Sequence, residues 1–340
     1  MGKFYGFLII SAAAFLISSC QLMFNPDFVN KVEAGITTNQ PYVYIAGQDG
    51  SGNACYWANG SYHQLTTGGT GKATSIFVSG STAYISGVDG NNKACYWVDG
   101  VEQSLENGAN GKAASIFVLN SIIYIAGVDA SLNACYWVNG VEKSLGNGLN
   151  GQAFSIFVSG GNVYVAGNDG SAYPQNVGYW INGSLNIIGT INYTYVDSIF
   201  IYGNTVYIAG NSVLHFPSYW TTNLTGGPLT ETDFPYGPSG PEINTIFVTG
   251  NNVYAAGVDG YDPAFVCYWI NGIETQLADA TTGFASSIFV FGESAYVAGN
   301  DKTPAACYWI NGVKQLLANG GNGRANSIFV ISTNSPPAKL

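Results

Sequence analysis

Short apolar segments recur along the chain, each without polar alternation and each bounded by Gly, Asn, Asp or Ser. Three strings occur seven times each, namely Ser/Thr-Ile-Phe-Val/Ile, Tyr-x-Ala-Gly (with Ser once in place of Ala) and Tyr-Trp. β-Branched and aromatic residues between turn residues are typical of strands. Each repeat is therefore predicted to hold three buried strands and a weaker fourth that ends in Leu, such as residues 141–145.

The tyrosines of Tyr-x-Ala-Gly give the length of the repeat, because they lie 40, 40, 40, 43, 47 and 42 residues apart. Asn-Gly or Asp-Gly follows the third strand in six repeats, which predicts a tight hairpin turn into the fourth. Four-stranded antiparallel units of this length, repeated seven times, are typical of propeller blades. The predicted fold is all-β, a seven-bladed β-propeller of four-stranded antiparallel blades.

The two ends of the repeat region predict how the ring closes. The chain enters the first repeat near its Tyr-x-Ala-Gly strand, and it leaves on an isolated Ser-Ile-Phe-Val segment, residues 327–330. We expect this C-terminal strand to join the first blade. Residues 35–38 are a weaker rival for the same place, because they lack the Phe. The propeller is predicted to span residues 34–331, with a tail at 332–340.

The N-terminus resembles an export signal. Lys3 precedes a mainly apolar stretch, residues 4–17, which is too short to span a bilayer but suits a signal peptide. The stretch ends in Ile17-Ser18-Ser19-Cys20, which resembles the lipobox of bacterial lipoproteins, where cleavage leaves the Cys as the lipid-bearing first residue. This predicts a signal peptide at 1–19, lipidation at Cys20 and a tether at 20–33. A plain signal peptide with an incidental Cys is the alternative.

Residues 34–331 resemble bacterial lipoproteins without an assigned activity that are built on Tyr-x-Ala-Gly and Tyr-Trp-x-Asn-Gly repeats. The resemblance implies a propeller fold and a place in the cell envelope. We therefore expect an exported protein that is lipid-anchored to an envelope membrane, facing the periplasm or the cell surface. We expect a monomer that contacts the membrane through its lipid anchor alone.

Composition excludes several classes of function. The net charge is −10 and basic runs are absent, which excludes nucleic acid as a partner. The chain has 2 histidines and lacks the Gly-x-Ser-x-Gly, His-Glu-x-x-His and phosphate-loop motifs. An EF-hand loop is also missing, so we predict neither a metal nor another cofactor and no enzymatic activity.

Two residue types recur at fixed places in the repeats. Cys precedes Tyr-Trp in five repeats, and equivalent positions in different blades lie too far apart for a disulfide or a shared zinc. We therefore interpret this place as one for a small buried residue. An Asp follows the second strand in six repeats. Capping of its own turn is favoured over an acidic ring that attracts cations.

The repeats differ in length at only a few connections. Insertions fall around residues 173–176 in repeat four, at 261–263 in repeat six and mainly within 230–244 in repeat five. The connections between second and third strands, and those between fourth and first strands, leave a blade on one face. Loops on one face of a repeat fold commonly carry binding. The candidate ligand-binding residues are Tyr173, His215, Phe216, Asp233, Phe234, Tyr236, Tyr261 and Asp262.

These observations predict an envelope-anchored binding protein that recognises a protein or a glycan through loops on one propeller face. Two other functions stay open. One is a carbohydrate-active enzyme with loop carboxylates around the central channel, which needs a carboxylate pair about 5–10 Å apart. The other is a structural scaffold that docks partners in an envelope assembly.

Overall fold

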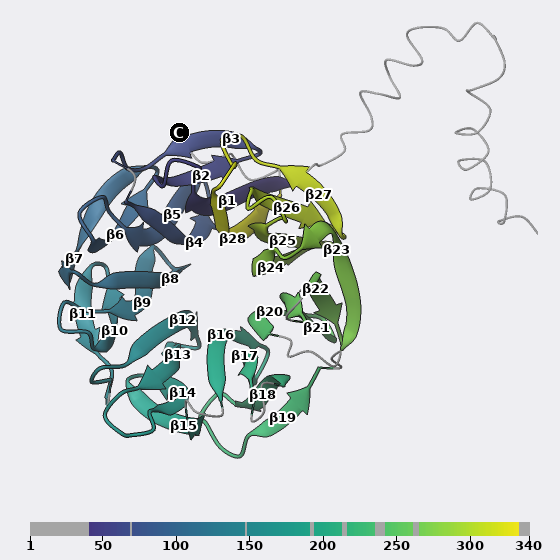
Figure 1. Ribbon diagram of the computed structural model, residues 1–340. Coiled ribbons are helices and arrows are strands. Elements are labelled where there is room, and N and C mark those ends of the chain that lie inside the picture. The colour runs from purple at the N-terminus through teal and green to yellow at the C-terminus, as the bar shows by residue number, and fades with distance from the viewer. Residues whose placement is uncertain are drawn as a thin grey trace, which may run out of the picture. The chain divides into compact units, whose positions relative to one another are not determined.

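The computed structural model describes residues 41–332, except 69, 147, 191–193, 213–215, 235–241 and 261–264. These residues form seven four-stranded antiparallel sheets. The sheets are the blades of a ring, with the first strand of each blade nearest the axis (Figure 1). The predicted seven-bladed propeller is confirmed. Cys20 and the predicted segments 1–19 and 20–33 lie outside the described residues, as does the tail from residue 333.

We number the blades by repeat and give each from its innermost strand outward. The strands are, in blade 1, β28 (Arg324–Ile331), β1 (Tyr42–Gln48), β2 (Ala54–Ala58) and β3 (Ser61–Gln64); in blade 2, β4 (Lys72–Ser79), β5 (Thr82–Val88), β6 (Lys93–Val98) and β7 (Val101–Ala109); in blade 3, β8 (Lys112–Leu119), β9 (Ile122–Val128), β10 (Ala134–Val138) and β11 (Val141–Ser144); and in blade 4, β12 (Gln152–Ser159), β13 (Asn162–Asp169), β14 (Asn176–Ile181) and β15 (Ser184–Thr190).

The remaining three blades follow the same order. Their strands are, in blade 5, β16 (Tyr195–Tyr202), β17 (Thr205–Asn211), β18 (Pro217–Asn223) and β19 (Thr230–Asp233); in blade 6, β20 (Glu242–Thr249), β21 (Asn252–Asp259), β22 (Phe265–Ile270) and β23 (Ile273–Thr281); and in blade 7, β24 (Phe284–Phe291), β25 (Ser294–Asn300), β26 (Ala306–Ile310) and β27 (Val313–Leu316). Among all the described residues, no helix is long and apolar enough to cross a bilayer.

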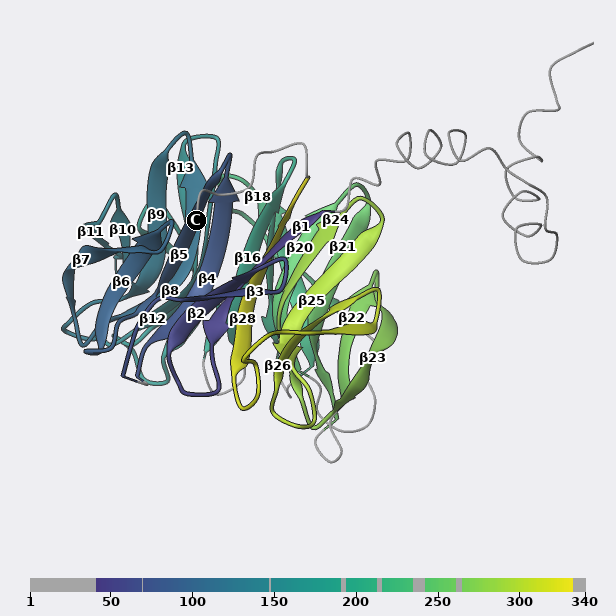
Figure 2. The same cartoon turned by 90° about the horizontal axis from the view of Figure 1, so that it is seen from above.

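The C-terminal strand closes the ring. β28 pairs antiparallel with β1, from Tyr42 opposite Ile331 to Gln48 opposite Arg324. The side view in Figure 2 shows these two strands together in one blade. The predicted closure is confirmed, and the rival segment 35–38 lies outside the described residues. Blade 1 therefore combines the two ends of the propeller sequence.

The hydrophobic core lies between the blades. The tryptophan of each third strand is at most 4% exposed and packs toward a neighbouring blade. Trp180 of blade 4, for example, shares one core cluster with Ala126 and Leu145 of blade 3. Its indole N–H also donates to the carbonyl of Gly146 in blade 3 at 2.7 Å. Each blade thus covers the apolar face of the next, as the uniformly apolar strands predict.

The innermost strands also contact one another around the axis. The phenylalanines of Ser/Thr-Ile-Phe form a closed ring, with neighbouring ring centroids 4.6–5.1 Å apart, and they are Phe77, Phe117, Phe157, Phe200, Phe247, Phe289 and Phe329. A serine hydroxyl accepts a backbone N–H from the next blade at six of the seven junctions, as between Ser115 and Ile156 at 3.3 Å. Six of the seven seams therefore combine aromatic packing with this hydrogen bond.

A β-bulge interrupts every innermost strand near its start. In β4 the register shifts between Ala73 and Ser75, which leaves Thr74 as the extra residue. The glycine of Tyr-x-Ala-Gly lies opposite the bulge, and in blade 2 a Cβ on Gly87 would overlap the carbonyl oxygen of Lys72. Only glycine permits this close approach. The repeated glycine therefore fixes the position of the first residue of each innermost strand.

Candidate ligand-binding site at the channel mouth

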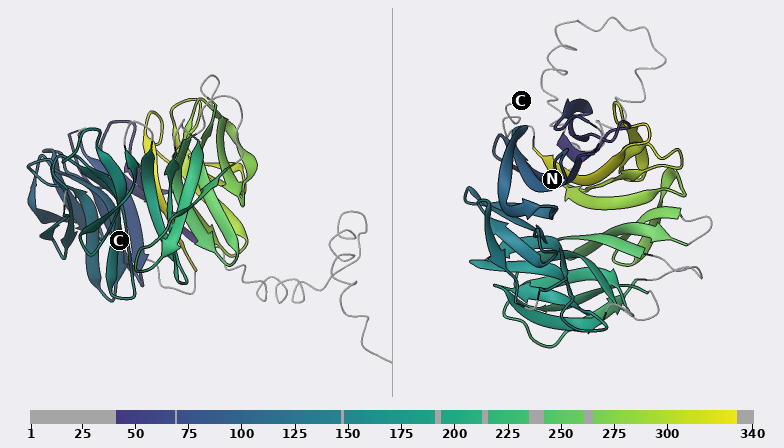
Figure 3. Two further views of the ribbon diagram at one scale, coloured as in Figure 1. Left: turned by 90° about the horizontal axis from the view of Figure 1, so that it is seen from below. Right: turned by 60° about the vertical axis from the view of Figure 1, so that its left-hand side comes forward.

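One face of the ring carries both kinds of variable connection. Lys72, the first residue of β4, pairs with Val88, the last residue of β5. The connection into β4 and the connection out of β5 therefore leave the blade on the same side. We call this side the loop face. Figure 3 shows the blades in two further views, with connections leaving them at both ends of the strands. The β13–β14 connection, which holds Tyr173, lies on it as predicted.

At the loop face the innermost strands, which surround the axis of the ring, begin with seven exposed side chains, and we call this region the channel mouth. In blade order they are Arg324, Lys72, Lys112, Gln152, Tyr195, Glu242 and Phe284. The three cationic residues come from consecutive blades, 1 to 3. We call Arg324, Lys72 and Lys112 the basic cluster. It contains three of the 10 Lys and Arg residues of a chain whose net charge is −10.

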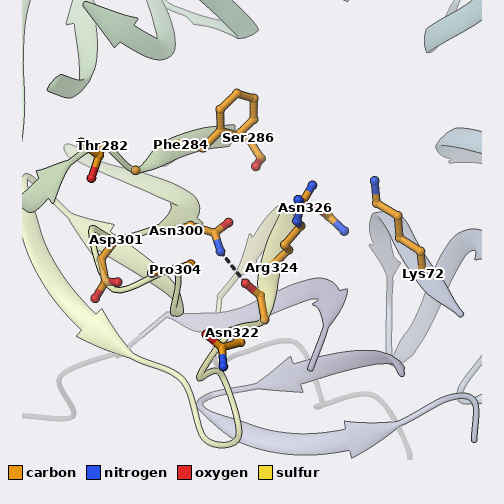
Figure 4. A pocket seen from close by; sticks show the side chains of 12 residues that line it. Lys72, Thr282, Phe284, Ser286, Asn300, Asp301, Pro304, Asn322, Arg324 and Asn326 are labelled. Carbon is orange, nitrogen blue, oxygen red and sulfur yellow. Dashed lines mark hydrogen bonds between the residues drawn. The ribbon is translucent and has the colours of Figure 1, made fainter. Parts of the chain in front are cut away.

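Two cavities open beside the basic cluster, and Lys72 lines both of them. The first has a volume of about 560 Å³ and lies between blades 7, 1 and 2, with Arg324, Asn322 and Phe284 in its wall. The second has a volume of about 690 Å³, and its wall includes Lys112 and Ala114 of blade 3. Figure 4 shows Lys72, Arg324 and Asn326 extending to the same side of the first cavity, with the Phe284 ring across from Lys72.

The charges of the basic cluster are uncompensated. None of its three cationic groups forms an ion pair with a described residue, where the acids in ion pairs are Asp279 and Asp301. Desolvation, followed by the positive charges of Arg324 and Lys112, lowers the pKa of Lys72. Burial and the two neighbouring cations thus make the charged form of Lys72 costly, and a bound anion would relieve that cost.

The opposite wall of the channel is acidic. Asp197 is the bulge residue of β16, and Glu242 begins β20 in the next blade. Burial, and then the negative charge of Glu242, raise the pKa of Asp197 to about 7. The channel mouth is therefore polarised, with cations over blades 1 to 3 and carboxylates over blades 5 and 6.

In five blades the repeated Asp after the second strand accepts a backbone N–H of its own turn, and these residues are Asp49, Asp89, Asp129, Asp169 and Asp301. The Asp49 carboxylate accepts the backbone N–H groups of Ser51 and Asn53, both at 2.9 Å. Burial acts to raise the pKa of Asp49, but hydrogen bonds from Tyr62 and Asn53 outweigh it and hold the pKa below its ordinary value. The predicted turn-capping role is thereby confirmed. Among the described residues, no three His, Cys, Asp or Glu side chains are grouped to hold a metal ion.

The five cysteines that precede Tyr-Trp are buried free thiols, each in a different blade, and they are Cys55, Cys95, Cys135, Cys267 and Cys307. Burial raises the pKa of all five, and for Cys307 it raises the pKa to about 12. A thiol in this state is a poor nucleophile. The place therefore holds a small apolar group, as interpreted from the repeats.

The four predicted loop residues that the structure describes differ in their surroundings. Tyr173 is 98% exposed, whereas Phe216 is half-buried. The Asp233 carboxylate accepts the hydroxyl of Ser218 at 2.8 Å. Phe234 is only 2% exposed and packs against the Trp269 ring, so its assignment to a ligand-binding surface is wrong. The other four predicted residues lie outside the described residues, and they are His215, Tyr236, Tyr261 and Asp262.

Sequence reasoning followed the insertions and so missed the basic cluster. A signal for it was present, because Lys72, Lys112 and Arg324 each lie five residues before the Phe of a repeat. The predicted place of the last strand in blade 1 would have made these three repeats neighbours in the ring. The insertions lie on the same face, but in blades 4 to 6 and not in blades 1 to 3.

Neither a protein-family model nor a curated protein matches the chain. Among solved structures, the chain is similar to the crystal structure of the computationally designed Ika8 protein, with a TM-score of 0.50 and 14% sequence identity. The match covers 86% of this chain and 91% of that one. At this identity the similarity concerns the fold alone.

Proposed function

We propose that this protein is an envelope-anchored binding protein that holds a protein or glycan ligand at the channel mouth of its loop face. The observation that carries the proposal is the pair of cavities of about 560 and 690 Å³ that share Lys72. Ligand sites are typically concave, of this size, and furnished with a few convergent polar groups. The uncompensated charges of the basic cluster supply such groups.

A bulky side chain in the mouth should abolish ligand capture. Ala114 is the bulge residue of β8 and lines the larger cavity, and the bulge residue of β12 is already Phe154. We expect Ala114→Phe to fold normally and to block the site. Ser79→Phe is the matched control at the other end of the channel, since blade 7 has Phe291 at the equivalent place.

The test uses the full chain in mild detergent on an array of glycans and purified proteins. Spots that bind the wild type and Ser79→Phe but not Ala114→Phe support the proposal. Binding that survives Ala114→Phe places the ligand elsewhere and contradicts it.

The anchor is proposed separately, at Cys20. Two acyl chains hold a protein stably on a membrane, whereas one gives marginal binding. We expect the wild type to incorporate labelled fatty acid and to sediment with membranes, and Cys20→Ser to do neither. Membrane association that survives Cys20→Ser would contradict lipid anchoring.

A carbohydrate-active enzyme is the second candidate function, and the pairing of Asp197 with Glu242 favours it. A carboxyl group whose pKa is near 7, beside a second carboxylate, suits a general acid. Because binding is the proposed role, we expect the wild type and Asp197→Asn to bind the ligand equally well, with no difference between them in hydrolysis of a bound glycan. Hydrolysis of a bound glycan that disappears in Asp197→Asn would instead establish the enzyme.

A further inference from the structure

We propose that the ligand is an anionic saccharide whose carboxylate, phosphate or sulfate groups lie against Lys72, Lys112 and Arg324. The inference rests on the proposed function and names the chemistry of the ligand. It joins two observations, a cavity pair and a basic cluster, that lie at the same place in the ring.

The first argument concerns charge. Three cations lie on consecutive innermost strands, and desolvation, followed by the charges of Arg324 and Lys112, lowers the pKa of Lys72. Asp301, the one acid among the described residues that line the smaller cavity, already accepts a hydrogen bond from Lys314 at 2.8 Å. Burial acts to raise the pKa of Asp301, but hydrogen bonds, the one from Lys314 first, outweigh it and hold the pKa well below its ordinary value. The positive charge of the mouth is thus left for a ligand, and multiple cations favour a ligand with several negative charges.

The second argument concerns the neutral groups beside the cations. The side-chain amides of Asn92, Asn110 and Asn322 line the two cavities and make no hydrogen bond with any described residue. Such amides both donate and accept, as a hydroxyl-rich ligand requires. Phe284 is 43% exposed in the same wall and offers an apolar face to a sugar ring.

The composition of the mouth decides between a saccharide and a peptide or nucleic acid. Protein interfaces are rich in buried aromatic and apolar anchors, whereas the described walls here offer mainly amides, hydroxyls and glycines. Single-stranded nucleic acid needs a row of aromatic rings and a long basic groove. The observed mixture of amides, three cations and one exposed ring fits an acidic oligosaccharide.

The test compares probes that differ in charge alone. The full chain in detergent is titrated by calorimetry with tetragalacturonate and with its methyl ester, which has the same sugar rings without the charges. A sulfated tetrasaccharide and a hexose phosphate distinguish the source of the negative charge. Hexaglutamate represents an acidic peptide.

The variants replace Lys with Gln, a residue that another repeat already has at the equivalent position. Gln152 begins β12 at the place that Lys72 and Lys112 occupy in β4 and β8, so Lys72→Gln/Lys112→Gln should fold. Lys93→Gln/Lys143→Gln changes the net charge equally and leaves the mouth intact. We expect at least one anionic saccharide to bind more than about tenfold more tightly than the neutral ester. The mouth variant should weaken this binding by about tenfold for each cation removed, and the control by less than about twofold.

Each other outcome overturns the inference. Equal binding of acid and ester, or equal losses in the two double variants, would remove the role of the basic cluster. Tighter binding of hexaglutamate than of every saccharide would assign an acidic peptide. If no anionic probe binds while Ala114→Phe still abolishes array binding, the inference fails and the proposed function stands. If array binding is insensitive to Ala114→Phe, both fail.

Discussion

The seven innermost strands differ in sequence between two positions, the Phe of each strand and the first residue of each strand at the loop face. At one level each innermost strand presents Phe, and the seven rings meet around the axis at 4.6–5.1 Å. Five residues earlier, at the loop face, the same strands present three cations, one acid, one amide and two aromatic rings. The backbone is alike at both levels, and a bulge and a close-packed glycine separate them.

The difference teaches where the fold constrains the side chain and where it does not. At the Phe level each side chain must pack against two neighbours, so every blade uses the same residue. At the mouth the side chains face a cavity, and the sequence can vary without loss of packing. The charge that collects at this unconstrained level, on consecutive blades, is the observation on which the proposed ligand depends.

The largest expected effect is the loss of one ring at the Phe level. Phe117 packs against Phe77 at 5.0 Å and Phe157 at 4.6 Å. We expect Phe117→Ala to lower the free energy of unfolding by about 3 kcal/mol, because a cavity forms and two aromatic contacts disappear. Urea unfolding followed by tryptophan fluorescence measures the change. A loss below about 1 kcal/mol would mean that the ring does not stabilise the propeller.

The next effect depends on pH and concerns the acidic wall. The pKa of Asp197 is raised to about 7 in the folded protein, so its protonated form stabilises the fold, and this stability disappears as the pH rises through 7. Asp197→Asn should therefore raise the Tm by a few degrees at pH 8 and change it little at pH 4. The bulge residues Asn244 and Asn326 show that this place accepts Asn. A larger gain at pH 4 than at pH 8 would contradict the assignment.

A smaller effect is expected for a hydrogen bond that joins two neighbouring blades at one seam. Ser115→Ala leaves the N–H of Ile156 without its acceptor, which should cost about 1 kcal/mol of stability. Ser286→Ala is the control, because no hydrogen bond joins its hydroxyl to a described residue. Equal losses in the two variants, measured by urea unfolding, would show that the seam bond contributes nothing.

The smallest effect on stability is expected at the mouth. Lys112→Gln should change the free energy of unfolding by less than about 0.5 kcal/mol, because the side chain is exposed and carries no ion pair with a described residue. Removing its charge also relieves repulsion with Lys72. A loss as large as that of Phe117→Ala would erase the contrast between the two levels.

The repeats predicted the fold down to the closure of the ring, because blade packing demands the same residues seven times. The Tyr-Trp strings mark the interblade core, and the last Ser-Ile-Phe-Val fills blade 1 as expected. The site could be predicted only to the correct face. Phe234 was assigned to a loop surface, but the end of β19 turns it into the core against Trp269. The basic cluster can be recognised only from the closed ring, which places blades 1 to 3 side by side, because Arg324 lies more than 200 residues from Lys112 in the sequence.

The most direct test of the account is a crystal structure of the protein with the anionic saccharide that binds most tightly. The account predicts that the acidic groups of the saccharide lie within hydrogen-bonding distance of Lys72, Lys112 and Arg324, with a sugar ring against Phe284. A saccharide bound against the blade 4 to 6 loops, or at the opposite end of the channel, would contradict it.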